Sequence, residues 1–518
     1  MTLRWNIGAL VVLICLAGVW PQDSFAQDGS TPESVPAQQD NGQPQVPAPA
    51  YGQQSGSAPA SENPPLTGLD LPSLEPHAAP LSYVQPGATV TETADSNVNN
   101  TVGNMNFVSV SRALGSLVLN RVWSHYNLAL DYVGGAAYYD EAGQRWKDLQ
   151  QMDIDQKITW KRGQFEARDS FSYLPEGNFG GAYGSLGSQG IGSLGNTAFG
   201  MLSEGNLLGA LGQAPRILNV SLGEVQQILT PKSAITATGG YAFLHFYGND
   251  VTTGTPFIGS SQISGQVGYD RLLTAKTQVA LAYAYAGFDF SVLGSQFHSH
   301  VIQAIYGHQI TGRMDLLIGA GPQLTQISLA CNFLEVLTNP SQCSVNSSGA
   351  IVGSIPDRRI GVAGRVRLRY KFPKTLLELS YQRFETAGSG LFAGAQTDVA
   401  RMSASRPLSR LWSLEMDAGY SRNSRLQPLS QLQLDTCGGS GQPLCPGTSA
   451  NTYTIGFAGL ALHRPFGRSL HGFASYQFSQ LEFSQSYCSV LAPTCSRIGN
   501  RETITIGLDW IPRPMRID

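Results

Sequence analysis

Apolar and polar residues alternate along much of the chain, from about residue 86 to residue 511. In 501–511, Ile504, Ile506 and Leu508 fall on one side of an extended chain, and Thr503 and Thr505 fall on the other. Successive side chains of a β-strand point to opposite faces, so a period of two residues is typical of a strand with one apolar and one polar face. The runs 359–371 and 411–422 alternate in the same way. This part of the chain is therefore predicted to consist of β-strands.

The alternating runs are separated by turn signals, and they predict about 18 strands, with 16 as the alternative. The predicted strands lie near 86–95, 105–119, 124–138, 149–161, 164–174, 215–229, 234–247, 260–272, 277–289, 297–310, 314–329, 358–371, 375–386, 397–408, 411–422, 451–463, 469–483 and 500–511. An even number returns both ends of the chain to one side of a barrel, as in outer-membrane barrels.

Short turns alternate with long connections between these strands. The short turns are polar and carry Gly or Pro, as in Arg162-Gly163, Thr311-Gly312-Arg313 and Phe372-Pro373-Lys374. The long connections lie near 175–213, 248–259, 330–357, 387–396, 423–450 and 484–499. Short periplasmic turns and long external loops are typical of a barrel in a bacterial outer membrane. The predicted fold class is thus all-β, a transmembrane antiparallel up-and-down β-barrel, and a secreted soluble β-protein is the alternative.

The composition agrees with a barrel and excludes other classes. Only 13% of the 518 residues are charged, Gly occurs 58 times, and no apolar run of 18 residues follows the N-terminal one. Such a chain offers no transmembrane helix after processing. A net charge of -3 gives no electrostatic footprint for nucleic acid, so no nucleic-acid partner is expected.

The N-terminal part of the chain divides into two segments. Residues 1–26 are predicted to be a signal peptide, with Arg4 before an apolar stretch and small residues before the cleavage site at Ala26. Residues 27–85 are rich in Pro, Gln and Ser and predict a disordered periplasmic arm, because they cannot bury enough apolar surface to offset their chain entropy. The barrel is predicted to occupy 86–518.

Six cysteines beyond the signal peptide fall in three close pairs within long connections. They are Cys331 with Cys343, Cys437 with Cys445, and Cys488 with Cys495. An exported chain reaches a compartment where disulfides form, so each pair is predicted to be a disulfide that braces an external loop.

Several segments carry a family resemblance. The run 87–98 contains Asp95-Ser96-Asn97 near its end, and Gly268-Tyr269-Asp270 and Gly419-Tyr420-Ser421 recur farther along. In these segments, and in style over most of 86–511, the chain resembles outer-membrane β-barrel porins of the kind associated with exopolysaccharide systems. The resemblance implies a barrel in the bacterial outer membrane that acts beside polysaccharide secretion, and it brings no catalytic residues.

A ladder of basic residues is the sharpest candidate for function. Cations on the lipid face of a barrel are costly, so this ladder is predicted to face the lumen, as are acids on nearby strands. The candidate pore-lining residues are Arg359, Arg365, Arg367, Arg369, Lys371, Glu378, Glu415 and Asp417. Cations on one wall and acids on another would set a transverse field that tunes ion selectivity. Alternatively, these charges pair with each other and brace the wall.

Two further features have open interpretations. The Gly-rich connection 175–213 either folds into the barrel as a constriction or stays outside as a loop. His298 and His300 share one face of a strand, but they have no third ligand nearby in sequence, so no metal site is predicted. No motif orders a nucleophile, a base and an orienting residue, so we expect neither an enzyme nor a cofactor.

The sequence thus predicts a porin-like passage for hydrophilic solutes, because a barrel of this size can enclose an aqueous channel. The alternatives are an accessory barrel of an exopolysaccharide export system and a structural barrel with a plugged lumen. The expected partners are outer-membrane lipid and, through the N-terminal arm, periplasmic or polysaccharide-export proteins. The oligomeric state stays open.

Overall fold

A computed structural model describes most of the chain beyond residue 81. The described residues are 82–98, 107–140, 146–174, 215–247, 258–290, 295–331, 336, 340–347, 351–388, 392–426, 451–487 and 496–517. They all lie within the compact unit Pro44–Asp518. Among them, no helix has the length and apolar character needed to cross a membrane.

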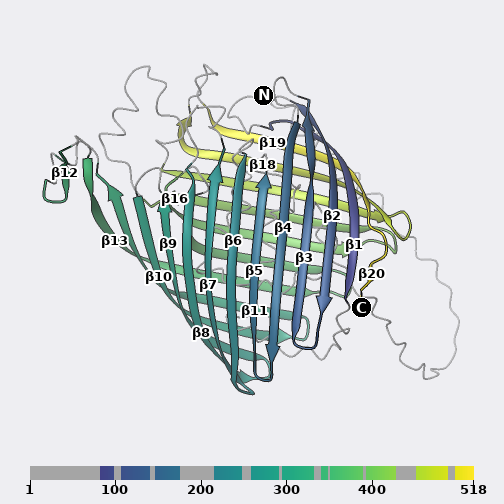
Figure 1. Ribbon diagram of the computed structural model, residues 1–518, viewed down its shortest axis with the longest axis horizontal. Coiled ribbons are helices and arrows are strands. Elements are labelled where there is room, and N and C mark those ends of the chain that lie inside the picture. The colour runs from purple at the N-terminus through teal and green to yellow at the C-terminus, as the bar shows by residue number, and fades with distance from the viewer. Residues whose placement is uncertain are drawn as a thin grey trace. The chain divides into compact units, whose positions relative to one another are not determined.

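The described residues form one long antiparallel meander (Figure 1). Its strands are β1 (Tyr83–Asp95), β2 (Val108–Val122), β3 (Tyr126–Tyr139), β4 (Trp146–Trp160), β5 (Gly163–Leu174), β6 (Arg216–Thr230), β7 (Ser233–Phe246), β8 (Ser260–Thr274), β9 (Thr277–Phe290), β10 (Ser295–Thr311), β11 (Met314–Ala330), β12 (Cys343–Val345), β13 (Ile351–Lys371), β14 (Leu376–Thr386), β15 (Ala395–Pro407), β16 (Ser413–Arg425), β17 (Thr452–Pro465), β18 (Leu470–Tyr487), β19 (Ser496–Trp510) and β20 (Met515–Arg516).

The sheet closes on itself. Each long strand pairs with the next one along the chain, and β1 pairs with β19, from Ala88 opposite Trp510 to Asp95 opposite Thr503. Apart from β12 and β20, which are two or three residues long, the described residues thus form a closed antiparallel barrel of 18 strands. The predicted fold class and strand number are confirmed.

The predicted strand boundaries differ from the observed ones at a few places. β1 begins at Tyr83 instead of near 86, and β13 begins at Ile351 instead of near 358. The sequence also did not predict β12, which pairs with the first residues of β13, or β20, which pairs with the start of β1. The alternation is weak there, so pairing with a neighbour decides where the strand ends.

The short turns gather at one end of the barrel, together with Tyr83 and the end of β19, which we assign to the periplasmic side. Three of them share a local contact, in which a threonine hydroxyl accepts a hydrogen bond from a backbone N–H two residues later. The hydroxyls of Thr230, Thr274 and Thr311 accept at 3.3, 3.2 and 3.3 Å. Such a contact stabilises a tight turn, which explains why these sequences end one strand and begin the next.

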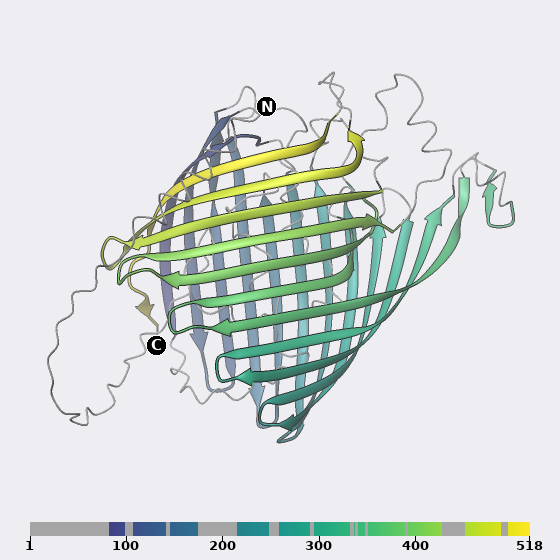
Figure 2. The same ribbon diagram turned by 180° about the vertical axis from the view of Figure 1, so that it is seen from behind.

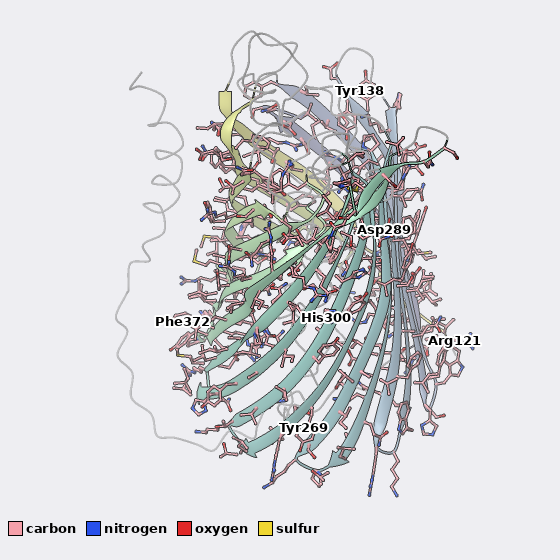
Figure 3. All side chains as sticks on the ribbon, turned by 90° about the vertical axis from the view of Figure 1, so that its left-hand side faces the viewer. Arg121, Tyr138, Tyr269, Asp289, His300 and Phe372 are labelled. Atoms are coloured by element: carbon pink, nitrogen blue, oxygen red, sulfur yellow. A yellow bond between two sulfur atoms is a disulfide. The ribbon has the colours of Figure 1, made fainter. Side chains whose placement is uncertain are left out.

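The outer face of the barrel is apolar. On β1, Val90 is 61% exposed, whereas Thr89 and Thr91 beside it are 3% and 4% exposed, because they point inward. Large apolar side chains exposed in this way include Leu117, Ile263, Leu281, Ile302, Val366, Ile504, Ile506 and Leu508. Tyr138 lies toward the extracellular ends of the strands, and Tyr269 and Phe372 lie toward the periplasmic ends (Figure 3). An apolar band between aromatic residues is the surface of a transmembrane barrel.

A closed barrel of this kind, with an apolar outer face and short turns at one end, belongs to the class of outer-membrane β-barrels. The protein is therefore a protein of the bacterial outer membrane.

Candidate functional site in the barrel interior

The basic ladder lies on the inner face of β13. Arg365, Arg367 and Arg369 alternate with the outward Val366 and Leu368, as the sequence predicts. The same inner face carries Arg359 and Lys371 at its two ends. Arg365 is 4% exposed and lies opposite Gly319 of β11, whose lack of a side chain leaves room for the arginine stem.

The predicted acidic partners lie next to basic groups. Glu378 of β14 is opposite Arg369 in the register. The Arg369 Nε also donates to Asp315 Oδ2 of β11 at 2.8 Å. Glu378, a predicted acid, and Asp315, which was not predicted, therefore lie beside Arg369 instead of facing the ladder from another wall.

The two predicted acids of β16 are likewise paired. Arg401 of β15 makes two hydrogen bonds to Asp417, at 2.9 and 3.0 Å. His463 of β17 lies 3.7 Å from Glu415, measured between Nε2 and Oε2. These acids do not form the second, negative wall that a transverse field needs.

An acidic wall lies on β3 to β6, whose acids were not predicted from the sequence to line the pore. Asp131 of β3 lies directly opposite Asp153 of β4, and Glu166 of β5 lies directly opposite Glu224 of β6. All four point to the inner face. Two ionised acids directly opposite each other across a strand pair would destabilise the sheet.

Two basic residues offset only part of this acidic wall. Arg168 of β5 lies 3.0 Å from Asp155 and also contacts Glu166. Lys157 of β4 lies 4.0 Å from Glu166. Among the described residues, the inner faces of β3 to β6 in the half nearer the periplasmic turns thus hold five acidic and two basic side chains. The acidic ones are Asp131, Asp153, Asp155, Glu166 and Glu224, and the basic ones are Lys157 and Arg168. In the sequence, charged residues stand at every second position as Asp153, Asp155 and Lys157, and this spacing could have indicated a charged inner face.

The acidic wall and the arginine ladder face each other. Along the closed sheet, β4 and β13 are eight strand positions apart out of 18, which is nearly opposite. Both sets lie in the half of the barrel nearer the periplasmic turns. The geometry therefore places a group of acidic side chains on one wall and a row of arginines on the other.

The extracellular half of the interior is filled differently. The extracellular ends of β14, β15 and β16 bend inward, so that Ala387 and Leu426 join a buried apolar cluster with Phe297 of β10. A methyl group added at Gly394, just before β15, would lie 2.8 Å from Phe297 Cε1. In an even sheet, β15 would be four strand spacings from β10, or about 19 Å. The extracellular ends of β14 to β16 therefore lie against the inner face of β10.

The inward bend corrects one expectation from the sequence. The connection near 387–396 was predicted to be an external loop, but its described residues 387–388 and 392–395 lie inside the barrel. Phe392 is 1% exposed and packs against Tyr453 of β17, with ring centroids 5.1 Å apart. Gly388 and Gly394 have φ values of +86° and +87°, so glycine is needed for this turn. The connection 175–213, for which an inward constriction and an external loop were both left open, lies outside the described residues.

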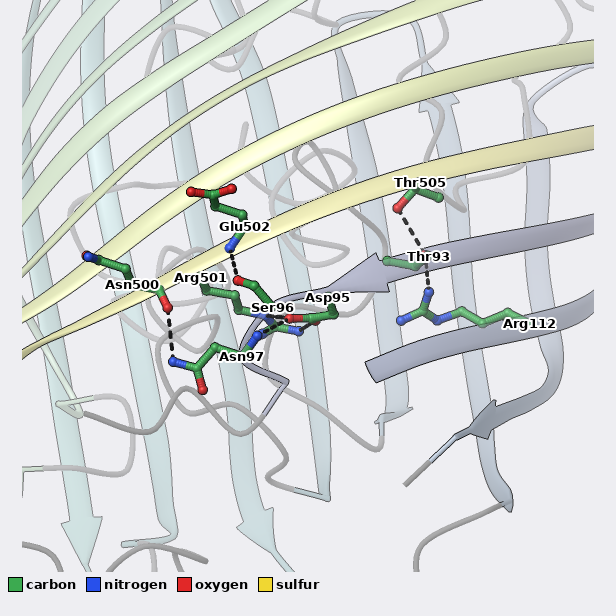
Figure 4. A network of polar contacts seen from close by, with 9 residues as sticks. All are labelled: Thr93, Asp95, Ser96, Asn97, Arg112, Asn500, Arg501, Glu502 and Thr505. Carbon is green, nitrogen blue, oxygen red and sulfur yellow. Dashed lines mark hydrogen bonds and ion pairs between the residues drawn. The ribbon is translucent and has the colours of Figure 1, made fainter. Parts of the chain in front are cut away.

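The Asp95-Ser96-Asn97 run closes the barrel at its extracellular end (Figure 4). The Arg501 Nε of β19 donates to both Asp95 carboxylate oxygens, at 3.1 and 3.0 Å. The Asn97 backbone N–H donates to Asp95 at 2.9 Å, and the Glu502 backbone N–H donates to the Ser96 hydroxyl at 2.8 Å. The segment that carries the family resemblance therefore joins the first strand to the last one.

The remaining candidates are structural. His298 and His300 lie on the outer face, where Tyr285 and Tyr283 contact their Nδ1 atoms at 2.9 and 2.8 Å. Within the described ranges, no three His, Cys, Asp or Glu side chains are grouped so as to hold a metal.

One of the three predicted disulfides can be seen. Cys331 and Cys343 are bonded, with their Cα atoms 5.7 Å apart, which confirms that pairing. The bond ties the end of β11 to β12 beside β13. The pairs Cys437 with Cys445 and Cys488 with Cys495 lie outside the described residues.

Comparison with known proteins gives only structural neighbours. No protein-family model and no curated protein matches the chain. The fold is similar to the ferric-catecholate import receptor Fiu of E. coli K12 in its open form, at 7% identity and a TM-score of 0.40, over 82% of this chain and 81% of that one. It is also similar to Pseudomonas aeruginosa OccK2 (OpdF), at 9% identity and a TM-score of 0.37, over 83% of this chain and 98% of that one. Pseudomonas aeruginosa OprD matches at 9% identity and 0.36, over 85% and 98%. Likeness at this level carries no argument about function.

Proposed function

We propose that the protein is a porin-like barrel through which small hydrophilic solutes cross the outer membrane. The observation that carries this proposal is the pair of opposed charged walls inside the barrel. A barrel that only needed stability would gain nothing from Asp131 opposite Asp153 or Glu166 opposite Glu224. A pore uses such walls to orient dipolar solutes and to select ions.

The inner face supports a polar passage over the periplasmic half. Asp155 and Lys157 keep 36% and 38% of their side chains exposed, although both point inward, so solvent reaches them inside the barrel. The arginine ladder and its acidic counterpart line the same half. The pore-lining residues predicted from the sequence therefore remain part of this proposal, with Asp131, Asp153, Glu166 and Glu224 added to them.

Solute passage is tested directly by swelling of liposomes that contain the refolded mature protein. Neutral sugars of increasing size should cause swelling at rates that fall with sugar size, because a pore of fixed width hinders larger solutes. The same protein, heat-unfolded before reconstitution, is the control. Liposomes that contain a folded barrel but swell no faster than this control would support a plugged structural barrel instead.

The association with exopolysaccharide export remains a second proposal, supported by the sequence resemblance. The segment that carries this resemblance clamps β1 to β19, so it accounts for a shared fold more directly than for a shared partner. In this proposal the part of the arm that precedes the barrel, residues 27–81, meets periplasmic or polysaccharide-export proteins. Deleting the arm while keeping the barrel should then reduce secreted polysaccharide, whereas an unchanged amount would argue against the association.

A further inference from the structure

The barrel wall has a seam between β13 and β14. β11 pairs with β13 all the way from Ser354 to Tyr370. β14 pairs with β13 only from Gly364 to Lys371. Between Ser354 and Ala363, the edge of β13 that faces β14 therefore has no paired strand within the described part of the chain. Figures 1 and 2 show this end of β13, with β12 beside it, diverging from the strands that follow.

This unpaired edge lies at the depth of the apolar band. Ile360 and Val362 of this segment point outward and are 84% and 58% exposed. An open sheet edge is unfavourable in hydrocarbon, because its backbone N–H and C=O groups find no partner there. At the seam, backbone N–H and C=O groups of β13 therefore have no paired strand within the described residues. A strand that paired with this edge of β13 would supply the missing hydrogen bonds.

The strand end that left the seam is held inside the barrel by a carboxylate. Glu385 lies two residues beyond Arg383, the last residue of β14 that pairs with β13. Its side chain is buried in the interior, where it accepts a hydrogen bond from the Thr325 hydroxyl of β11. The neighbouring Gln323 donates to Ser299 of β10 at 2.9 Å, which completes a polar cluster on that wall.

The apolar contacts of the inserted end are small. Ala387, Ala393 and Gly394 present little side-chain surface to Phe297 and the wall around it. Leaving the contact with Phe297 would therefore uncover a limited apolar area, whereas Phe392 packs in a separate apolar cluster with Tyr453 of β17.

Extending the observed register shows what would happen if β14 returned to the wall. Because Gly364 is opposite Arg383, the next partners would be Ala363 with Phe384, Val362 with Glu385, and Ile360 with Ala387. This register would place Glu385 on the outer face beside Val362, in lipid. A carboxylate there is costly.

We propose that the seam is a switch: the extracellular end of β14 moves between the lumen and the wall, and Glu385 sets the balance between the two positions. In the inserted position, one carboxylate oxygen of Glu385 accepts the hydrogen bond from Thr325, the β13 edge is open and the extracellular half of the lumen is narrowed. In the returned position, the wall is continuous and the lumen is wider, but Glu385 faces lipid. The gating role of this switch rests on the proposed passage of solutes. The rearrangement of the wall does not depend on that passage.

The rearrangement is tested by disulfide trapping with an Ile360→Cys/Ala387→Cys pair. These positions are directly opposite only in the returned register, whereas Ala387 is buried inside and Ile360 is exposed outside in the inserted one. A Val366→Cys/Tyr381→Cys pair is the control, because these residues are opposite already. Cross-linking of the 360/387 pair should be at least about tenfold faster when Glu385→Leu is added, and cross-linking of the control pair should not change.

Equal cross-linking rates with and without Glu385→Leu, or no 360/387 cross-link in either background, would overturn the switch. Glu385→Gln keeps the size of the side chain and removes its charge, so it gives the same test, with a smaller increase, if the leucine variant does not fold.

The gating role is tested by single-channel recording. Glu385→Leu should raise the ratio of open to closed time by about tenfold, because the returned position no longer places a charge in lipid. Glu92→Leu is the control for the loss of a carboxylate, since Glu92 is exposed on the outer face far from the seam, where it accepts a hydrogen bond from Ser111 at 2.6 Å. If the 360/387 pair cross-links as expected but no conductance is seen, the rearrangement of the wall stands and the proposed passage of solutes is refuted. Conductance that Glu385→Leu leaves unchanged would retain the passage and refute the gate.

Discussion

The ion pair between Asp95 and Arg501 holds the two ends of the barrel together, and its removal has a calculable effect. The two side chains are 1% and 2% exposed. Asp95→Ala leaves the guanidinium of Arg501 buried without its carboxylate. Breaking a buried pair from one side costs about 3–5 kcal/mol, so the free energy of unfolding should fall by about that amount.

The assay is urea unfolding of the protein in lipid vesicles, followed by the heat-modifiable shift of the folded band on a gel. Asp357→Ala is the matched control, because it breaks the Arg359–Asp357 pair, whose side chains are 38% and 46% exposed. An exposed pair contributes about 0–1 kcal/mol, so the control should be nearly as stable as the unmodified protein.

A double variant tests whether the loss of stability comes from the unpaired buried charge or from the loss of the contact between β1 and β19. Asp95→Leu with Arg501→Met removes both charges and should recover most of the lost stability, because apolar residues of similar size often replace a buried ion pair at little cost. The reasoning is refuted if Asp95→Ala loses no more stability than Asp357→Ala.

Three other changes have defined outcomes. Ile506→Arg places a charge on the lipid face, where Ile506 is 63% exposed, and should reduce stability by about 2–4 kcal/mol in the same unfolding assay. Gly394→Ala should cost about 1–3 kcal/mol, because φ is +87° there and the added methyl group meets Phe297; an unchanged midpoint would argue against the inserted hairpin. Asp131→Asn removes the repulsion from Asp153 and should add about 0.2–1 kcal/mol, whereas a loss of stability would show that the pair is favourable.

The strands could be predicted from the sequence because alternation is local. Val366, Leu368 and Tyr370 alternate with Arg367 and Arg369, and this pattern alone fixes which residues share a face, whatever the neighbouring strands are. The strand number follows from counting such runs, and the closed barrel confirms it.

The inward position of the connection between β14 and β15, called the inserted hairpin here, could not be predicted in the same way. Its contact joins Phe297 to Gly394, which lie on strands that are not neighbours, and turn residues look alike inside and outside a barrel. One signal was present, however. Along β14, Leu379 and Tyr381 occupy outward positions, and Arg383 and Glu385 occupy the next two. Charges at lipid-facing positions indicate that the strand leaves the membrane wall there.

The opposed walls also needed the structure. The sequence showed the arginine ladder, but only the register shows that Asp315 balances Arg369 and that the unbalanced acids lie on β3 to β6. Such pairings depend on the register between neighbouring strands, and the pattern within a single strand does not encode this register.

The central claim, an aqueous passage between charged walls, is tested most directly by ion selectivity. Single channels of the refolded mature protein are recorded across a salt gradient, beside an Asp131→Asn/Asp153→Asn variant and an Arg365→Ala/Arg367→Ala/Arg369→Ala variant that are shown to be folded by gel shift. We expect stable conductance steps, with selectivity shifted toward anions in the first variant and toward cations in the second. A folded barrel that never conducts, or one whose selectivity neither variant changes, would contradict the account.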